Sequence, residues 1–256
     1  MLNIRLMSNT SKTKLDKRLI LVVKNLLDKF KIFSWIDEGT LLGIYRQKAI
    51  IPGDKDFDFS VNFKDMKKIL LMCNELESLG FHVKYQKYLP YVEDLIQIYP
   101  QYDSEMNGFH VDLNIYYFCD SSAIRRDPHY PVGRINTIIL KFANLFSYLS
   151  TKKGNFSYFN KILFNISRLA YSLYVRVGAS IWQSIPEKFF SSWEECEFLN
   201  KKFKIPSNTE KYLTYRYGEN WSQPCNNWSW KESEDKAIKI TKLSKLSIKK
   251  FKTQQK

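Results

Sequence analysis

Acidic and aromatic residues alternate along residues 56–61, which read DFDFSV. Side chains alternate between the two faces of a β-strand, so Asp56 and Asp58 share one face while Phe57 and Phe59 share the other. Two carboxylates about 5 Å apart repel by about 3 kcal/mol at an effective dielectric of about 20. A cation or a shared proton relieves that repulsion, and oxygen ligands of this kind favour Mg²⁺ together with substrate phosphates. The pattern therefore predicts a metal-dependent phosphoryl site on one face of a sheet.

A second strand with an acid in an apolar run is predicted in residues 108–118, GFHVDLNIYYF. His110, Asp112 and Asn114 share one face of it. An isolated buried carboxylate costs several kcal/mol, so Asp112 must be paired, hydrogen-bonded or metal-bound, and it is the third candidate carboxylate. His110 is either a base or a partner of a metal ligand, but a histidine with a structural role is the favoured interpretation.

A candidate phosphate site precedes the acidic strand. Residues 32–36 predict a short buried strand, and Gly39-Thr40 turn it into a helical segment that ends at Arg46. The free N–H groups at a helix start bind anions, although Gly39 alone is also explained as a residue that permits the turn. Pro52-Gly53 then predicts a turn into the acidic strand.

The rest of the chain predicts an α+β fold, with a mixed β-sheet covered by helices and followed by a helical and aromatic C-terminal lobe. Helices are expected at 14–30 and 69–79, the latter ended by Gly80, and strands at 81–88 and 94–99. Residues 125–131 are expected to form a loop. Two apolar helices, expected at 136–149 and 158–182, either pack on the core, which is favoured, or rest on a membrane surface. A capped helix is expected at 206–218. The expected divisions are a core at 1–124, a lobe at 125–230 on the acceptor side, and a basic tail at 231–256.

Charge and cysteine content narrow the partners and the compartment. A net charge of +14 attracts anions in general. The four cysteines are widely spaced, without a CxxC pair, and are expected to be reduced thiols. The N-terminus has no apolar signal region, so a cytoplasmic location is expected. The tail is either a basic amphipathic helix for an anionic surface or a solvated segment. Trp221, Trp228 and Trp230 suit a sugar ring, but sealing a core is the favoured interpretation.

In order, these elements resemble the nucleotidyltransferase fold of the DNA polymerase β superfamily, and more closely the LicD/fukutin-like phosphotransferase family. GTLLGIYR at 39–46, Ile51-Pro52 and DKDFD at 54–58 are similar to that family's GTLLG-x-x-R and IPWDDDhDh signature. The segment 110–114 takes the place of its later VDhF-like element, and YLTYRYGENWSQP at 212–224 resembles its C-terminal element. Gly53 replaces the usual Trp, and Lys55 replaces the middle Asp. Because Lys55 is expected on the opposite strand face from Asp56, the metal pair should survive.

The resemblance implies transfer of phosphocholine, glycerol phosphate or ribitol phosphate from a CDP-activated donor to a sugar hydroxyl. The acceptor would be a cell-surface glycan, such as lipopolysaccharide, capsule or teichoic acid, or its lipid-linked precursor. Asp56, Asp58 and Asp112 are the implied metal ligands, for Mg²⁺ with Mn²⁺ as an alternative, and Asp112 is also the nearest proton acceptor. Gly39 and Thr40 would hold phosphate, and Arg46 would pair with the diphosphate or brace the acidic strand.

The enzyme is expected to be cytoplasmic, and peripheral contact of its basic tail with the inner face of an anionic membrane is an alternative to a solvated tail. The alternatives are a nucleotidyltransferase acting on RNA or a small molecule, and a scaffold without catalysis that binds anionic lipid or glycan. Nucleic acid is the less favoured partner.

Overall fold

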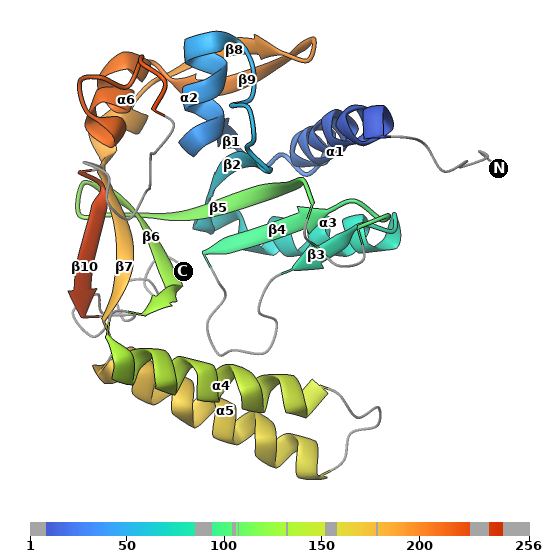
Figure 1. Cartoon of the computed structure of the whole chain (residues 1–256), viewed down its shortest axis with the longest axis vertical. Coiled ribbons are helices and arrows are strands. Elements are labelled where there is room, and N and C mark those ends of the chain that lie inside the picture. Colours follow the sequence, from blue (N-terminus) through green and yellow to red (C-terminus); the bar gives the residue numbers. More distant parts are fainter. Residues whose placement is uncertain are drawn as a thin grey trace, which may run out of the picture. The chain divides into compact units, whose positions relative to one another are not determined.

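A computed structural model describes residues 9–84, 94–103, 106, 108–131, 133–151, 158–177, 179–225 and 236–242 (Figure 1). The chain divides into two compact units. One comprises Met1–Lys84, Leu95–Tyr116 and Glu187–Glu234, and the other comprises Tyr85–Asp94, Tyr117–Pro186 and Asp235–Lys256. This division differs from the expected boundary at residue 124, because residues 187–225 return to the first unit.

The first unit is built on a mixed sheet. Its strands run in the order β3 (His82–Lys84), β4 (Leu95–Tyr99), β5 (His110–Cys119), β2 (Asp56–Asn62), β1 (Ser34–Ile36), β9 (Lys201–Pro206) and β8 (Trp193–Phe198). The pairs β2–β5 and β1–β9 are parallel, and the remaining pairs are antiparallel. The predicted α+β class with a mixed sheet is therefore confirmed. The prediction did not include β8 and β9, which complete the sheet beside β1.

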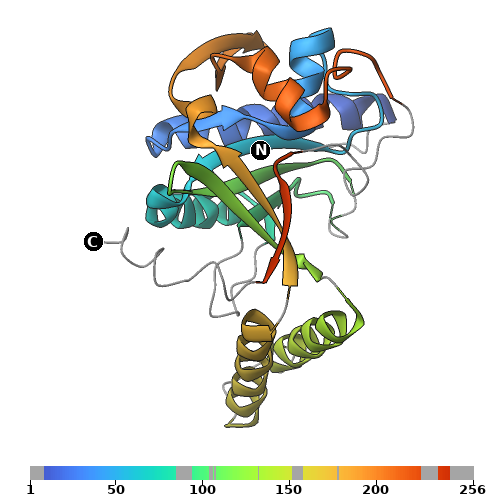
Figure 2. The same ribbon diagram turned by 90° about the vertical axis from the view of Figure 1, so that its left-hand side faces the viewer.

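One face of this sheet forms the apolar core. Phe57 and Phe59 are fully buried and contact Phe203 of β9, as the alternating sequence requires. Helices α1 (Asn9–Lys29) and α3 (Met66–Ser78) cover this face, and the short helix η1 (Phe63–Asp65) leads into α3 (Figures 1 and 2). An ion pair from Lys29 to Glu75 joins the two helices, with the Nζ and Oε1 atoms 2.7 Å apart. Both predicted covering helices are confirmed.

The opposite face of the sheet carries polar side chains and is bordered by α2 (Glu38–Gln47) and α6 (Thr209–Tyr217). Helix α2 begins earlier than predicted, so Gly39 and Thr40 lie within its first turn rather than before it. Glu38 has a φ of +50°, a left-handed conformation that costs a residue other than glycine about 1–3 kcal/mol. Helix α6 confirms the predicted helix, with Asn208 before it and Gly218 after it, but the Asn208 side chain makes no capping hydrogen bond. A short helix η2 (Glu187–Phe190) precedes β8.

The second unit contains a small antiparallel sheet and a helical hairpin. The sheet order is β10 (Ile238–Lys242), β7 (Ala179–Pro186) and β6 (Ser122–Pro131), with residues 117–119 of β5 paired to β6. Helices α4 (Arg134–Thr151) and α5 (Tyr158–Val177) pack side by side as a hairpin (Figures 1 and 2).

Three predictions for the second unit are wrong in detail. The expected loop at 125–131 is part of strand β6, whose register shifts between Asp127 and Pro131. Such a bulge accommodates Pro128, which has no N–H for the strand ladder. Helix α5 ends at Val177, and residues 179–182 are strand because they pair with both neighbours. Residues 238–242 of the basic tail form a strand instead of an amphipathic helix, and residues 231–235 and 243–256 lie outside the described part.

All four cysteines are free thiols, as predicted. Among the described residues, no helix combines the length and the apolar character needed to cross a bilayer.

Candidate active site

The acidic residues of β2 and β5 lie on one face of the parallel ladder, in residue pairs two positions apart. Asp56 lies level with His110, and Asp58 lies level with Asp112. One ligand atom each from Asp56, His110 and Asp112 can be chosen so that all three lie within 4.8 Å of one another. The predicted acids Asp56 and Asp112 lie on strands that are more than fifty residues apart in the sequence. The fold brings them together, and His110 lies beside them.

Asp58 is held at the base of this cluster. It is 7% exposed, and its carboxylate accepts hydrogen bonds from Thr40 Oγ1 at 3.2 Å and from Asn114 Nδ2 at 3.1 Å. The Thr40 hydroxyl also accepts from the Asp58 backbone N–H at 2.8 Å. Burial, and then the charges of Asp56 and Asp112, raise the pKa of Asp58 well above its usual value. A cation bound beside these acids would stabilise the ionised form of Asp58.

Asp54 extends the cluster toward α2. Burial first, and then the charge of Asp56 and a hydrogen bond to it, raise the pKa of Asp54 to about 7. Near neutral pH the carboxyl group of Asp54 is therefore protonated for part of the time. A Cβ atom at Gly39 would lie 3.1 Å from Asp54 Oδ2. The group for which Gly39 leaves room is thus a carboxylate of the same site. Phosphate binding by Gly39 and Thr40 stays a prediction.

His110 is oriented by contacts on both of its ring nitrogens. Nδ1 lies 3.1 Å from the carbonyl oxygen of Gly108, which can only accept, so Nδ1 carries a proton. In the neutral ring Nε2 then presents its lone pair, 3.1 Å from Gln97 Nε2 and 3.3 Å from Asp112 Oδ1. Stacking on Tyr99, with ring centroids 4.7 Å apart, fixes the ring plane. This is how imidazole ligands of metals are commonly held.

The donor set fits a divalent cation. Nε2 of His110 and Oδ1 of Asp112 are both acceptors, and Gln97 Nε2 donates toward both of them. Two lone pairs 3.3 Å apart are stable when a positive charge lies between or beside them, as a proton or a metal ion. Asp56 supplies an oxygen ligand to the same position. Because His110 faces the carboxylates, a role as metal ligand stays open beside the structural role that the sequence favoured.

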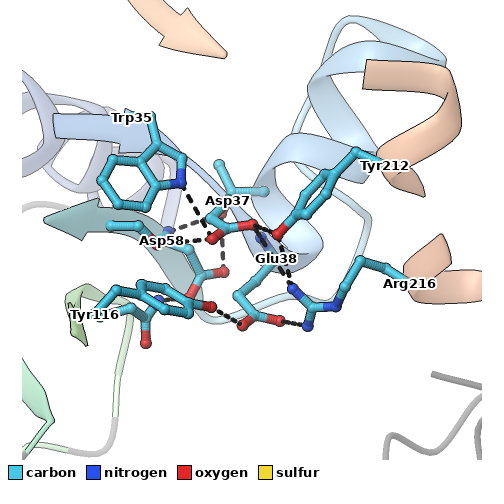
Figure 3. A network of polar contacts seen from close by, with 10 residues as sticks. Trp35, Asp37, Glu38, Asp58, Tyr116, Tyr212 and Arg216 are labelled. Carbon is cyan, nitrogen blue, oxygen red and sulfur yellow. Dashed lines mark hydrogen bonds and ion pairs between the residues drawn. The ribbon is translucent and has the colours of Figure 1, made fainter. Parts of the chain in front are cut away.

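A second polar network lies at the start of α2, centred on the fully buried Asp37 (Figure 3). The carboxylate of Asp37 accepts hydrogen bonds from four groups. They are Tyr212 Oη at 2.5 Å, Ser60 Oγ at 2.9 Å, Trp35 Nε1 at 3.3 Å and the Glu38 backbone N–H at 2.9 Å. Strands β1 and β2 and helix α6 are thereby tied to the first turn of α2.

Arg216 supplies the positive charge of this network. It is 1% exposed, and it donates from Nη2 to Glu38 Oε2 at 2.5 Å and from Nη1 to Tyr212 Oη at 3.0 Å (Figure 3). Its Nη1 lies 3.8 Å from Asp37 Oδ1. Burial, followed by the charge of Glu38, raises the pKa of Asp37, whereas Arg216 and Tyr212 lower it. The network therefore fixes the first turn of α2, and with it the Thr40 that holds Asp58.

The sequence interpretation did not identify Asp37, Glu38 or Arg216 as site residues. An Asp immediately before a helical run is a capping signal, which would have pointed to Asp37. A lone Arg in the aromatic run of α6 signals a need for an acidic partner. That partner, Glu38, lies 178 positions away in the chain, so local patterns cannot reveal it.

Arg46 lies at the other end of α2. Its guanidinium donates to Trp221 O at 3.4 Å and to Gln47 Oε1 at 3.3 Å, and its Nε is buried without a hydrogen-bond partner among the described residues. These contacts do not include the acidic strand, so of its two predicted roles only diphosphate binding stays open. Trp221 also contacts Tyr45, with ring centroids 5.9 Å apart. Trp228 and Trp230 lie outside the described residues.

Comparison with known proteins identifies relatives of this architecture. Residues 31–133 match the family model "LicD/FKTN/FKRP, nucleotidyltransferase domain". The chain is 25% identical over 220 residues to ribitol-5-phosphate transferase FKTN of Macaca fascicularis and 24% identical to that of Homo sapiens, covering 86% of this chain. It spans about a third of the length of these relatives, 36%.

Two further matches are shorter or weaker. An uncharacterised protein of Rickettsia prowazekii (strain Madrid E) is 39% identical over 62 residues, which are 24% of this chain and 23% of that protein. Among solved structures, the antibiotic-resistance factor ANT(2'')-Ia aligns at 12% identity over 63% of this chain and 85% of that chain, with a TM-score of 0.30. A score that low gives no basis for assigning a shared fold. Residues 31–133 are therefore similar to the nucleotidyltransferase domain of the LicD/fukutin-like family, and the likeness to FKTN extends along most of the sequence.

Proposed function

We propose that this protein is a metal-dependent phosphotransferase. It would move a substituted phosphate, of the ribitol phosphate, glycerol phosphate or phosphocholine type, from a CDP-activated donor to a sugar hydroxyl. The acceptor would be a glycan or its lipid-linked precursor. The observation that carries this proposal is the convergence of Asp56, His110 and Asp112 inside the segment that matches the family model. The ribitol-5-phosphate transferase names of the relatives support the substrate class.

The site residues fit the charge changes of this reaction. A divalent cation, Mg²⁺ or alternatively Mn²⁺, held by Asp56, Asp58 and Asp112 with His110, would neutralise the donor diphosphate. The acceptor oxygen forms a bond to the phosphorus that carries the alcohol, and the bridging P–O bond to CMP breaks. The hydroxyl proton passes to a carboxylate, for which we propose Asp112. Gln97, which donates to Asp112 Oδ1 at 3.3 Å, would hold that carboxylate in place.

The donor phosphates would lie against the first turn of α2. Because the Thr40 hydroxyl is bonded to Asp58, Thr40 would contribute to phosphate binding only through its backbone N–H. Gly39 would do the same, and its lack of a side chain leaves room beside Asp54. Arg46 would bind the diphosphate through its buried Nε, which has no hydrogen-bond partner in the described part of the chain.

An assay of CMP release tests the proposal. The purified protein is incubated with Mg²⁺ or Mn²⁺, candidate glycans and, in turn, CDP-ribitol, CDP-glycerol and CDP-choline. We expect CMP release with one donor, and a loss of at least about 10³-fold in Asp56→Asn because a metal ligand is removed. Glu77→Gln, an exposed substitution on α3, is the matched control and should retain activity. If no donor releases CMP although calorimetry shows metal binding, the proposal is wrong. Release of pyrophosphate from a nucleoside triphosphate would instead indicate nucleotidyl transfer.

A further inference from the structure

The α4–α5 hairpin (residues 134–151 and 158–177) exposes large apolar side chains between Ile135 and Leu149 and between Tyr158 and Leu173. The most exposed are Ile135 at 73%, Ile138 at 65%, Tyr158 at 82% and Leu169 at 73%. Scattered single apolar residues on a surface are ordinary, but a contiguous series of them marks an interaction site. The hairpin therefore has an apolar surface that the described part of the chain leaves uncovered.

The exposed residues of α4 form a stripe at helical spacing. Ile135, Ile138, Phe142, Leu145 and Leu149 are separated by three or four positions, so they share one face of the helix. The spacing excludes a random distribution of apolar residues around α4. An amphipathic helix with an uncovered apolar stripe gains free energy when the stripe is buried in a lipid interface or against another molecule.

The two helices also share a small core that is separate from this stripe. Leu140 and Ala143 of α4 are buried together with Tyr171 and Tyr174 of α5 and with Ile124 of β6. The Ser167 hydroxyl donates to the Ala143 carbonyl oxygen at 2.8 Å, which fixes the close approach of the two helices. The stripe is therefore not needed to hold α4 and α5 together, and it is available for a partner.

The charge of the hairpin is of one sign. Its helical residues include Arg134, Lys141, Lys161, Arg168 and Arg176, and neither helix contains an Asp or a Glu. A surface that combines basic residues with exposed Leu, Ile, Phe and Tyr is complementary to an anionic lipid bilayer, which offers both acyl chains and negative headgroups. A second copy of the hairpin fits less well, because like charges would face each other.

We propose that the α4–α5 hairpin lies in the interface of an anionic bilayer. The apolar stripe would enter the boundary between headgroups and acyl chains, and the basic side chains would contact the phosphates of the headgroups. This inference goes beyond the proposed reaction, and its test measures lipid binding without any turnover.

Sedimentation with vesicles tests the proposal on the full chain. We expect the wild type to bind vesicles of phosphatidylglycerol and phosphatidylcholine mixed in equal parts, and to bind pure phosphatidylcholine more weakly. The pair Ile138→Glu and Leu145→Glu, both in the stripe, should weaken binding at least about tenfold, because two apolar contacts are lost and two negative charges are added. Both positions are exposed, so the fold should survive, as circular dichroism would verify. The matched control, Leu71→Glu with Leu79→Glu on exposed positions of α3, should bind as the wild type does.

A fluorescence readout distinguishes insertion from contact at the surface. Phe142→Trp, at a stripe position that is 48% exposed, should shift its emission to the blue with anionic vesicles and be quenched by brominated acyl chains. Leu71→Trp should show neither change. The proposal is overturned if the wild type does not sediment with anionic vesicles, or if the stripe variant binds as tightly as the wild type. It is also overturned if the stripe variant changes only the oligomeric state seen by light scattering, which would identify a protein partner instead of lipid.

Discussion

Replacing Arg216 by methionine should destabilise the first unit through the acids that it leaves behind. The guanidinium is 1% exposed, and its removal leaves Glu38 without its ion pair and Asp37 without its nearest positive charge. Breaking a buried pair costs about 3–5 kcal/mol. The side chain of Glu38 is 17% exposed and keeps some hydration, so we expect a loss near the lower limit, about 3 kcal/mol. A loss of that size lowers Tm by about 6–12 °C for a domain of 150–250 residues.

The same substitution should make unfolding depend more strongly on pH. Burial already raises the pKa of Asp37, and Arg216 opposes that rise, so the pKa of Asp37 should climb further in Arg216→Met. A carboxyl group whose pKa is raised by folding binds its proton more tightly in the folded state. Stability is then unaffected below the pKa of the unfolded state, near 3.9, and falls as pH rises from there to the folded pKa. The loss in Arg216→Met should therefore be small at pH 4 and largest at pH 7.5.

Urea unfolding followed by circular dichroism at pH 4 and pH 7.5 measures both effects. Lys211→Met, at an exposed position of the same helix, is the matched control and should change stability by less than about 0.5 kcal/mol. Adding Glu38→Gln to Arg216→Met should recover part of the loss, because the uncompensated charge is removed. A loss in Arg216→Met below about 1 kcal/mol at pH 7.5, or a loss that grows toward pH 4, would refute this account of the network.

Three further substitutions test the site. His110→Asn should weaken Mn²⁺ binding about tenfold or more, and it should abolish the nitrogen modulation in the electron spin echo of bound Mn²⁺. If the wild-type protein shows no such modulation, His110 is not a ligand. Thr40→Val removes the hydrogen-bond partner of the buried Asp58 N–H and should lower the free energy of unfolding in urea by about 1–3 kcal/mol. Thr40→Ser should retain most of the stability. Equal losses in the two variants would contradict this role of the hydroxyl. Gly43→Ala places a Cβ atom 2.7 Å from the Ala49 carbonyl oxygen and should lower the free energy of unfolding by about 1–3 kcal/mol. An unchanged urea midpoint in this variant would contradict the prediction.

Much of the first unit could be predicted because its signals are local. Alternation in DFDFSV correctly separated the buried Phe57 and Phe59 from Asp56 and Asp58, and the same rule placed Asp112 on the polar face of β5. The α1, α3 and α6 helices followed from apolar spacing and capping residues. These features depend on a backbone period of two or 3.6 residues, which a short window of sequence contains in full.

The errors fall where pairing decides the structure. Residues 125–131 contain two prolines and several charges, which are typical of a loop, yet they form part of β6 because β7 lies beside them. Residues 238–242 look amphipathic and basic, but they pair with β7 as β10. In both segments, hydrogen bonds to a strand distant in sequence outweigh the weak local preference.

The sequence by itself determined the acids of the site, the faces on which they lie and the resemblance to the LicD/fukutin-like family. Only the tertiary structure showed that Asp56 and Asp58 stand level with His110 and Asp112, because strand register is a contact between separate segments. It also decided the environment of Asp37, since Tyr212 and Arg216 arrive through β9 and α6 from far along the chain. Residue types and short spacings can be read from a short stretch of sequence. Burial, strand register and the partners of a buried charge exist only after the chain has folded.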